Sequence, residues 1–151
     1  MPAVSDAASP AEFLFRTRIR FHQADPAGVL FFGRVTELLQ AAYEELVADM
    51  GLDHRAHFAQ HETSTPIAHL EIDYHRPIQA GEDITVRVRV ARIGSRSFTL
   101  AFGLDDEDGQ RRVSAETVFV FTLIEGERFL PAPLPEDLRA RLARYRVVDS
   151  A

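Results

Sequence analysis

One segment of this chain carries apolar residues at helical spacing, whereas the stretches on either side of it alternate between apolar and polar residues. The segment runs from residue 31 to residue 50. Its apolar side comprises Phe31, Val35, Leu38, Leu39, Ala42, Leu46 and Met50. Tyr43 and Val47 widen this stripe, and Gly51 belongs to a residue type that often ends a helix. An apolar stripe this wide predicts a helix that a sheet largely encloses.

The alternating stretches predict β-strands with one buried face, because side chains on a strand point to opposite faces in turn. The first strand is expected at Phe13–Phe21, with Phe13, Phe15, Ile19 and Phe21 on its buried face. Four more are expected at Ile67–Ile78, Ile84–Val90, Phe98–Leu104 and Val113–Ile124. The last of these is apolar on both faces, which predicts that it is central in the sheet or covered by a partner subunit.

Arginines occupy the other face of the first expected strand, at Arg16, Arg18 and Arg20. Such a row suits either a phosphate-binding patch or an ordinary solvated face, and we favour the solvated face. Gly94 and Ser95 mark the turn between the third and fourth strands, and residues 105–110 predict a hairpin turn. Short turns of this kind join antiparallel neighbours.

These elements predict an α+β fold in which a five-stranded antiparallel sheet wraps around one long central helix. A short amphipathic helix is expected in the segment PEDLRARLARY near the C-terminus. We expect a single domain over residues 12–146, with tails at residues 1–11 and 147–151. The outer face of such a sheet is partly apolar, which favours a symmetric dimer.

Composition excludes several kinds of chemistry. The chain contains no cysteine and no lysine, so thiolate nucleophiles, cysteine-bound zinc and lysine Schiff bases are absent. A formal net charge of -6 argues against a nucleic-acid partner, and no apolar run reaches the roughly 20 residues that span a bilayer. We therefore expect a cytoplasmic protein with no membrane partner and no cofactor.

Three histidines allow an alternative site. His54, His57 and His61 would share one face of a helix, and three imidazoles on one face could hold zinc. Nothing in the sequence supplies the groups that would orient these rings, so a polar connecting segment is the preferred interpretation. His69 and His75 are expected on the polar face of their strand.

Asp25 stands in a tight turn, RFHQADPAGVLFFGRV, between the first strand and the helix. It precedes the helix by too many residues to be a simple N-cap. The first backbone N–H groups of a helix lack partners within it and carry the positive end of its dipole. Such N–H groups can bind a developing oxyanion, and a carboxylate beside them can attack a carbonyl or activate water. The turn therefore suits hydrolysis of an activated acyl group, such as a thioester.

The turn Asp25-Pro26-Ala27-Gly28-Val29-Leu30-Phe31-Phe32, the strand order and the stretch PIAHLEIDYHRPIQAGEDI resemble the hotdog-fold acyl-CoA thioesterases of the 4-hydroxybenzoyl-CoA thioesterase type. The resemblance covers roughly residues 13–124. It implies an acyl-CoA substrate and a homodimer, formed by edge-to-edge pairing of two sheets, or a homotetramer. It also implies catalytic roles for Asp25 and for the backbone N–H of Phe32. The implied substrate-binding residues are Gly28, Phe31, Gly94, Ser95 and Arg96, with no metal ligand.

The pair Phe31-Phe32 is most similar to the 1,4-dihydroxy-2-naphthoyl-CoA hydrolases of quinone biosynthesis. Phenylalanines there would offer a stackable surface to a flat aromatic acyl group, although both could equally be core residues. The expected activity is hydrolysis of an aromatic acyl-CoA, possible substrates being 1,4-dihydroxy-2-naphthoyl-CoA and 4-hydroxybenzoyl-CoA, with Asp25 as nucleophile or general base. A thioesterase for shorter acyl chains or acyl carrier protein, and a non-catalytic acyl-CoA-binding hotdog domain, remain alternatives. A hotdog hydratase is disfavoured, because no Asp/His dyad is apparent.

Overall fold

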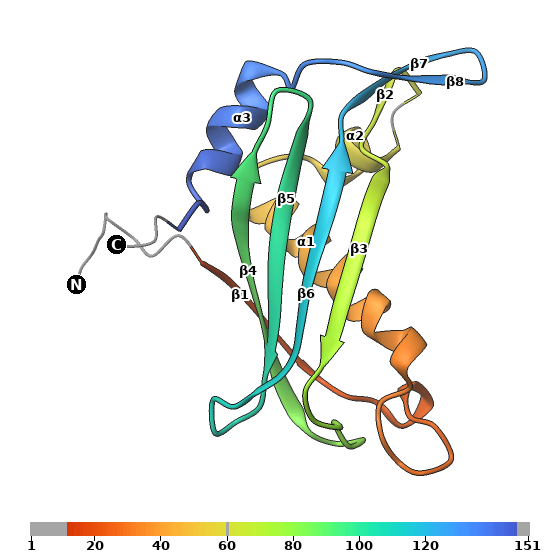
Figure 1. The fold of residues 1–151 in the computed structure, drawn as a ribbon, viewed down its shortest axis with the longest axis vertical. Helices are drawn as coiled ribbons and strands as arrows, with labels where there is room; N and C mark the ends of the chain where they lie inside the picture. Colours follow the sequence, from red (N-terminus) through yellow and green to blue (C-terminus); the bar gives the residue numbers. More distant parts are fainter. Residues whose placement is uncertain (1–11, 60, 148–151) are drawn as a thin grey trace.

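A computed structural model describes residues 12–59 and 61–147 of the chain. Its main sheet has five antiparallel strands in the order β1-β4-β5-β6-β3, and this sheet curves around one long helix, α1 (Figure 1). The strands are β1 (Phe13–Arg18), β3 (Ile67–Tyr74), β4 (Asp83–Ile93), β5 (Ser97–Asp105) and β6 (Arg111–Val120), and α1 spans Val35–Asp49. The predicted architecture is confirmed. The expected tail at residues 1–11, and all but the first residue of the one expected at residues 147–151, lie outside the described residues.

Helix α1 packs its predicted apolar stripe into the hollow of the sheet. Good helix formers fill most of the segment TELLQAAYEEL. The buried residues of the helix are Val35, Leu38, Leu39, Ala42, Tyr43, Leu46 and Val47. They meet the inward rows of β4 and β5, which are Ile84, Val86, Val88, Val90, Phe98, Leu100, Phe102 and Leu104. After the helix, Gly51 has a φ of 84°, a left-handed conformation that glycine adopts without strain.

The predicted strand Val113–Ile124 is in fact two strands in two sheets. Strand β6 ends at Val120, and β7 (Thr122–Glu125) pairs with β2 (Thr63–Ser64) and β8 (Arg128–Pro131) in a small second sheet. The chain changes sheets at Phe121, whose N–H donates to the carbonyl of Arg96 and whose carbonyl accepts from Ala132. The apolar pattern on both faces therefore marks a passage between two sheets.

Short helices connect the main elements. Helix α2 (His54–Phe58) begins at Asp53, whose carboxylate accepts a 2.9 Å hydrogen bond from the N–H of Ala56. Helix α3 (Glu136–Ala143) confirms the predicted C-terminal helix. Among the described residues, none of the helices has the length and apolar character needed to traverse a bilayer.

The C-terminal end of the expected first strand and the start of the expected helix differ from the prediction. The chain leaves β1 after Arg18 and forms a 3₁₀ helix, η1 (Phe21–Gln23), so Phe21 is 91% exposed and its expected burial is wrong. A second 3₁₀ helix, η2 (Phe32–Arg34), precedes α1. Phe31 therefore lies outside the long helix.

Candidate active site

The loop between η1 and η2 folds back on itself, which brings Asp25 onto one arm and Phe32 to the end of the other. The arms are joined by a bridge between Ala24 and Leu30 and by a 2.9 Å hydrogen bond from the Phe31 N–H to the Gln23 carbonyl. The loop is also anchored to the core, since the Leu30 N–H donates to the carbonyl of Ile78, a buried residue.

Gly28 closes the tip of this loop. Its φ is 82°, a conformation that L side chains rarely adopt, and its N–H donates a 2.9 Å hydrogen bond to the Asp25 carbonyl. The Asp25 N–H in turn donates to the carbonyl of Val29 at 2.8 Å. The positive φ explains why glycine occupies this position, and the two hydrogen bonds fix the backbone on which the carboxylate of Asp25 is mounted.

The carboxylate of Asp25 is half-buried and is held by its own turn. Its Oδ1 accepts hydrogen bonds from the N–H of Ala27 at 2.9 Å and of Val29 at 3.3 Å. The sequence spacing predicted that this carboxylate would not cap α1, and it does not. Within the described part of the chain its Oδ2 has no hydrogen-bond or ion-pair partner. One oxygen is thus fixed and the other is available.

The chain just before α1 offers unpaired backbone donors. The N–H groups of Phe32 and Gly33 begin η2, and neither has an acceptor among the residues that the structure describes. The side chains of Phe31 and Phe32 are 44% and 66% exposed, with ring centroids 4.8 Å apart. They are therefore surface residues, which excludes the core alternative for this pair in the isolated chain.

The turn Gly94–Arg96 joins β4 to β5 as predicted, and the N–H of Gly94 donates to the carbonyl of Ser97 at 2.7 Å. It lies beside α3, where Arg139 donates to the Gly94 carbonyl at 2.9 Å, and at the end of the sheet opposite to the Asp25 loop (Figure 1). The eleven residues of β4 separate the two ends, which amounts to about 35 Å at the rise of a strand. One chain does not bring this turn and Asp25 together.

The three histidines of the zinc alternative do not converge. His54 Nε2 lies 2.7 Å from Glu44 Oε1, His57 Nε2 lies 3.2 Å from the Tyr43 hydroxyl, and α2 ends at Phe58, before His61. In residues 12–59 and 61–147, no group of three or more His, Cys, Asp or Glu side chains is placed to hold a metal ion. His75 instead lies 3.0 Å from the Ser114 hydroxyl.

Two cavities are lined by other polar groups. One, of about 310 Å³, lies between α1, α2 and β2, and the hydrogen-bonded pair Tyr43 and His57 forms part of its wall. Burial raises the pKa of Tyr43 to about 12. Burial also lowers the pKa of His57, and the charge of His54 lowers it further. The spacing of Tyr43 and His57 in the sequence does not predict this pair, because their contact depends on where α2 packs against α1.

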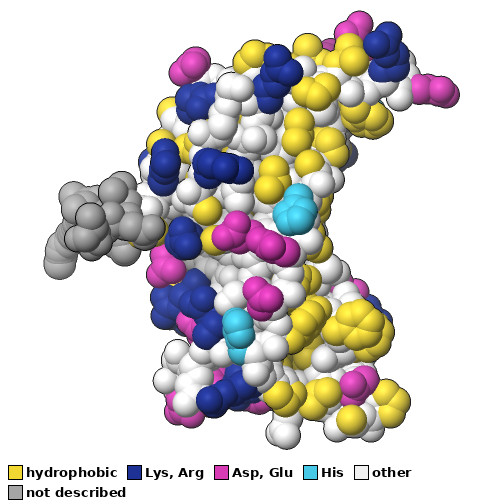
Figure 2. All heavy atoms as spheres, in the orientation of Figure 1, with side chains coloured by type: hydrophobic (Ala, Val, Ile, Leu, Met, Phe, Trp, Pro, Cys, Tyr) yellow, Lys and Arg dark blue, Asp and Glu magenta, His cyan; other side chains and the backbone are white. Residues whose placement is uncertain are grey.

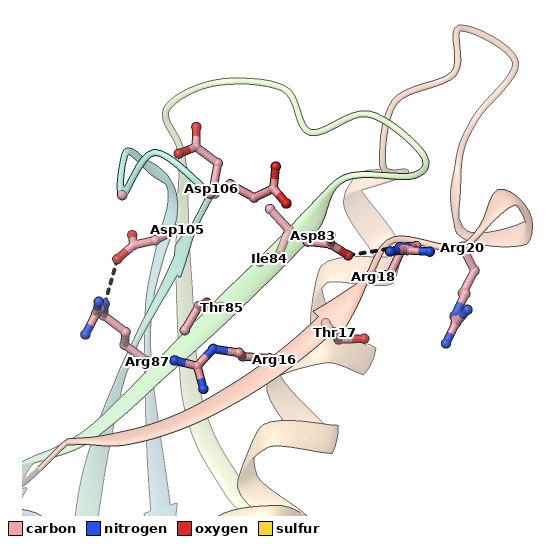
Figure 3. Close-up of a pocket in the computed structure, with 12 residues that line it drawn as sticks. Arg16, Thr17, Arg18, Arg20, Asp83, Ile84, Thr85, Arg87, Asp105 and Asp106 are labelled. Carbon is pink, nitrogen blue, oxygen red and sulfur yellow. Dashed lines mark hydrogen bonds and ion pairs between the residues drawn. The ribbon is translucent and has the colours of Figure 1, made fainter.

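The other cavity, about 790 Å³, is an open hollow on the outer face of β1 and β4 (Figure 3). It contains the predicted arginine row. Arg18 pairs with Asp83 at 2.9 Å, and all three arginines are exposed. Both acids and arginines line this hollow, which agrees with the interpretation of a solvated face.

Comparison with known proteins gives the family. The model of the thioesterase-like superfamily matches residues 19–142. The chain belongs to this superfamily. A 1,4-dihydroxy-2-naphthoyl-CoA hydrolase of Synechococcus elongatus is 30% identical to this member over 130 residues, which are 85% of this chain and 93% of the relative.

Solved structures of the superfamily share the fold. A 1,4-dihydroxy-2-naphthoyl-CoA thioesterase from Synechocystis superposes with a TM-score of 0.80 at 20% identity, covering 87% of this chain and 96% of that one. A mutant 4-hydroxybenzoyl-CoA thioesterase complexed with 4-hydroxybenzoyl-CoA gives a TM-score of 0.79 at 20% identity, with 87% and 99% covered. The hotdog fold predicted from the sequence is confirmed.

Proposed function

We propose that this thioesterase-superfamily member hydrolyses an aromatic acyl-CoA to the free acid and CoA, with Asp25 as its catalytic carboxylate. One observation carries the proposal. The Asp25 carboxylate, with one oxygen unpaired, and the unpaired backbone N–H groups of Phe32 and Gly33 belong to the same anchored loop. Thioester hydrolysis needs both, a group that delivers the nucleophile and donors for the charge that develops on the carbonyl oxygen.

The reaction balances with water as the only co-reactant. In the general-base route, Asp25 takes a proton from water, the oxygen attacks the thioester carbon, and the C–S bond breaks as the proton passes to the departing CoA thiolate. In the nucleophilic route, Asp25 itself attacks and releases CoA, and water then opens the mixed anhydride. The N–H of Phe32 stabilises the oxyanion in either route, a contribution worth roughly 100- to 1,000-fold in rate.

The aromatic acyl class is supported by the names of the relatives and by the exposed rings of this chain. The relatives compared above are named for 1,4-dihydroxy-2-naphthoyl-CoA and 4-hydroxybenzoyl-CoA. Phe31 and Phe32 stand beside the proposed reaction centre with much of their rings exposed. A flat aromatic acyl group can stack on such rings, and this contact is more favourable than that of an aliphatic chain.

The proposal includes a second copy of the chain at the edge of β3. Strand β3 is an outer strand of the sheet, and its apolar side chains Ile67, Leu70 and Tyr74 are 53%, 37% and 50% exposed. An exposed apolar edge strand calls for a partner. When two such edges pair antiparallel, the end of the partner's sheet that lies farthest from its own Asp25 loop comes to lie near the Asp25 loop of the first copy. The partner's turn Gly94–Arg96 then lies on the side from which the CoA arm approaches.

Release of thiol from synthetic acyl-CoAs tests the proposal. Purified protein should cleave 4-hydroxybenzoyl-CoA and 1,4-dihydroxy-2-naphthoyl-CoA, and Asp25→Asn should lower kcat by roughly 100-fold or more. Asparagine retains the oxygen that accepts from Ala27 and Val29, so the loop should keep its shape. Asp53→Asn is the matched control, because it makes the same change at a carboxylate that also accepts from the backbone.

Wild-type activity in Asp25→Asn would refute the assignment of Asp25. Saturable binding of acyl-CoA by the wild type without thiol release would instead identify a binding domain. A single turnover in ¹⁸O-water separates the two routes, since water opening a mixed anhydride at the side-chain carbon leaves label on Asp25. Label found only in the acid product would favour the general-base route.

A further inference from the structure

The turn between β4 and β5, Gly94–Arg96, has its first two carbonyl groups bonded to the segment that carries α3. The guanidinium of Arg139 donates from one nitrogen, Nη2, to the Gly94 carbonyl at 2.9 Å and to the Ser95 carbonyl at 3.4 Å. The Ser95 carbonyl also accepts from the N–H of Leu134 at 2.9 Å. Two neighbouring carbonyls thus converge on one arginine, so a single side chain fixes the orientation of two peptide groups.

The same two peptide groups present unpaired N–H groups on the other side of the turn. In a trans peptide group the C=O and the N–H lie in one plane and point in opposite directions. Arg139 holds the carbonyls of Gly94 and Ser95, so the N–H groups of Ser95 and Arg96 point away from α3. Neither N–H has an acceptor among residues 12–59 and 61–147, and both residues are exposed. The turn therefore offers two adjacent backbone donors to the solvent.

The turn also lies in a region of positive charge. Arg92, Arg96 and Arg139 have no ion-pair partner within the part of the chain that the structure describes. Figure 2 shows dark-blue arginine side chains gathered at this end of the sheet, beside α3, with few magenta acids among them. Guanidinium groups and exposed backbone N–H groups both bind phosphate oxygens, so this end of the sheet suits a phosphate group.

We propose that Arg139 is a positioning residue for the phosphate groups of the substrate: it orients the turn, and the turn binds the phosphates. The inference rests on the proposed function, in which the substrate is an acyl-CoA. CoA carries a pyrophosphate and a 3′-phosphate, whereas its thiol-bearing arm, pantetheine, carries no phosphate. Arg139 contacts carbonyls rather than the substrate, so it acts through the N–H groups of Ser95 and Arg96.

A second arginine, directly after α3, separates this role from a structural one. Arg144 also donates from Nη2 to a backbone carbonyl, that of Met50, at 3.0 Å. Met50 follows α1 and lies outside the turn, so loss of this bond should weaken the attachment of α3 without moving Ser95 or Arg96. Arg144→Met is therefore the matched control for Arg139→Met.

Thioesters of CoA and of pantetheine test the proposal when their kinetics are compared. Arg139→Met should raise KM for 4-hydroxybenzoyl-CoA roughly tenfold and leave kcat unchanged, because hydrogen bonds to a charged group are lost on binding. KM for 4-hydroxybenzoyl-pantetheine should equal that of the wild type, since this substrate has no phosphate. Arg139→Lys, which can still donate to one carbonyl, should recover part of the loss. Arg144→Met should lower the midpoint of urea unfolding and keep both KM values.

Two kinetic results would overturn the proposal. A wild-type KM for 4-hydroxybenzoyl-CoA in Arg139→Met would show that the turn binds without help from the arginine. An equal rise in KM for both thioesters would show that the arginine acts on something other than the phosphates. Given a rise confined to the CoA thioester, dephospho-CoA identifies the group bound. A rise that persists with dephospho-CoA assigns the contact to the pyrophosphate, and one that disappears assigns it to the 3′-phosphate.

Binding of CoA itself separates this inference from the proposed function. Isothermal titration calorimetry with CoA needs no hydrolysis, and Arg139→Met should bind CoA roughly tenfold more weakly than the wild type. Absence of thiol release from acyl-CoA by the wild type would refute the proposed function. Equal affinities of the two proteins for CoA would overturn the role of Arg139.

Discussion

The hydroxyl of Tyr74 donates a 2.9 Å hydrogen bond to the backbone carbonyl of Phe32. Tyr74 is the last residue of β3 and Phe32 the first of η2, so this bond ties the edge of the sheet to the start of the helix. The Phe32 carbonyl and the Gly33 N–H belong to one planar peptide group. A bond that holds the carbonyl therefore also orients the Gly33 N–H, one of the two unpaired donors of the proposed site.

We predict that Tyr74→Phe lowers kcat roughly fivefold, the equivalent of one net hydrogen bond of about 1 kcal/mol. The ring remains, so KM should change less than kcat. Tyr145→Phe is the control, because the Tyr145 hydroxyl donates to Asp49 Oδ2 at 2.6 Å far from the Asp25 loop. That variant should lose stability in urea titrations and keep its kcat. Equal kcat values for wild type and Tyr74→Phe would show that the bond does not serve the reaction.

The backbone N–H of Phe32 can be removed without disturbing the fold. Phe32 is the first residue of a 3₁₀ helix, where proline is well tolerated, and Phe31 before it has φ -65° and ψ 131°, which proline requires of its predecessor. We predict that Phe32→Pro lowers kcat by roughly 100- to 1,000-fold through loss of an oxyanion donor. Stopped-flow thiol release under saturating acyl-CoA measures this change.

Phe32→Ala is the matched control for the backbone change. It removes the same exposed ring but keeps the N–H, so its main effect should be a higher KM for aromatic acyl-CoA. If alanine and proline lower kcat equally, the ring rather than the N–H is responsible, and the proposed oxyanion donor is wrong.

Gly28 gives a further test, because strain and function can be separated there. Its φ of 82° is costly for alanine, by roughly 1–2 kcal/mol, although an added Cβ would meet no atom within 4 Å. We predict that Gly28→Ala lowers both the free energy of unfolding and kcat, since relief of strain would move Asp25. Gly109, with a φ of 80° and equally open surroundings, lies in the β5–β6 hairpin. Gly109→Ala should lose similar stability at unchanged kcat.

Periodicity predicted the enclosed helix and the sheet because burial repeats along each element. Every residue of the predicted stripe from Val35 to Met50 is buried. The prediction from periodicity was wrong at Phe21 and Phe121, where backbone hydrogen bonds redirect the chain while the apolar pattern continues. Asp25 could be singled out because turn residues and the helix start are local features. The distance from Asp25 to the Gly94 turn could not be predicted, since it depends on the direction of β4.

His57 should make the stability of the fold depend on pH. Burial, and the nearby charge of His54, lower the pKa of His57 below its ordinary value, so the folded chain favours the neutral ring that contacts Tyr43. Near pH 6.5 and below, the unfolded chain then binds more protons than the folded one. The contribution of His57 is therefore complete above about pH 6.5 and is lost as the pH falls through the lowered pKa of the folded state.

We predict that His57→Gln, which can still hydrogen-bond to Tyr43 but does not titrate, flattens the fall in unfolding free energy between about pH 7 and pH 5. Urea titrations at intervals across this range measure the slope. His22→Gln, at an exposed position in η1, is the control and should leave the slope as in the wild type. Parallel profiles for wild type and His57→Gln would mean that the buried ring is protonated as readily in the folded chain as in the unfolded one.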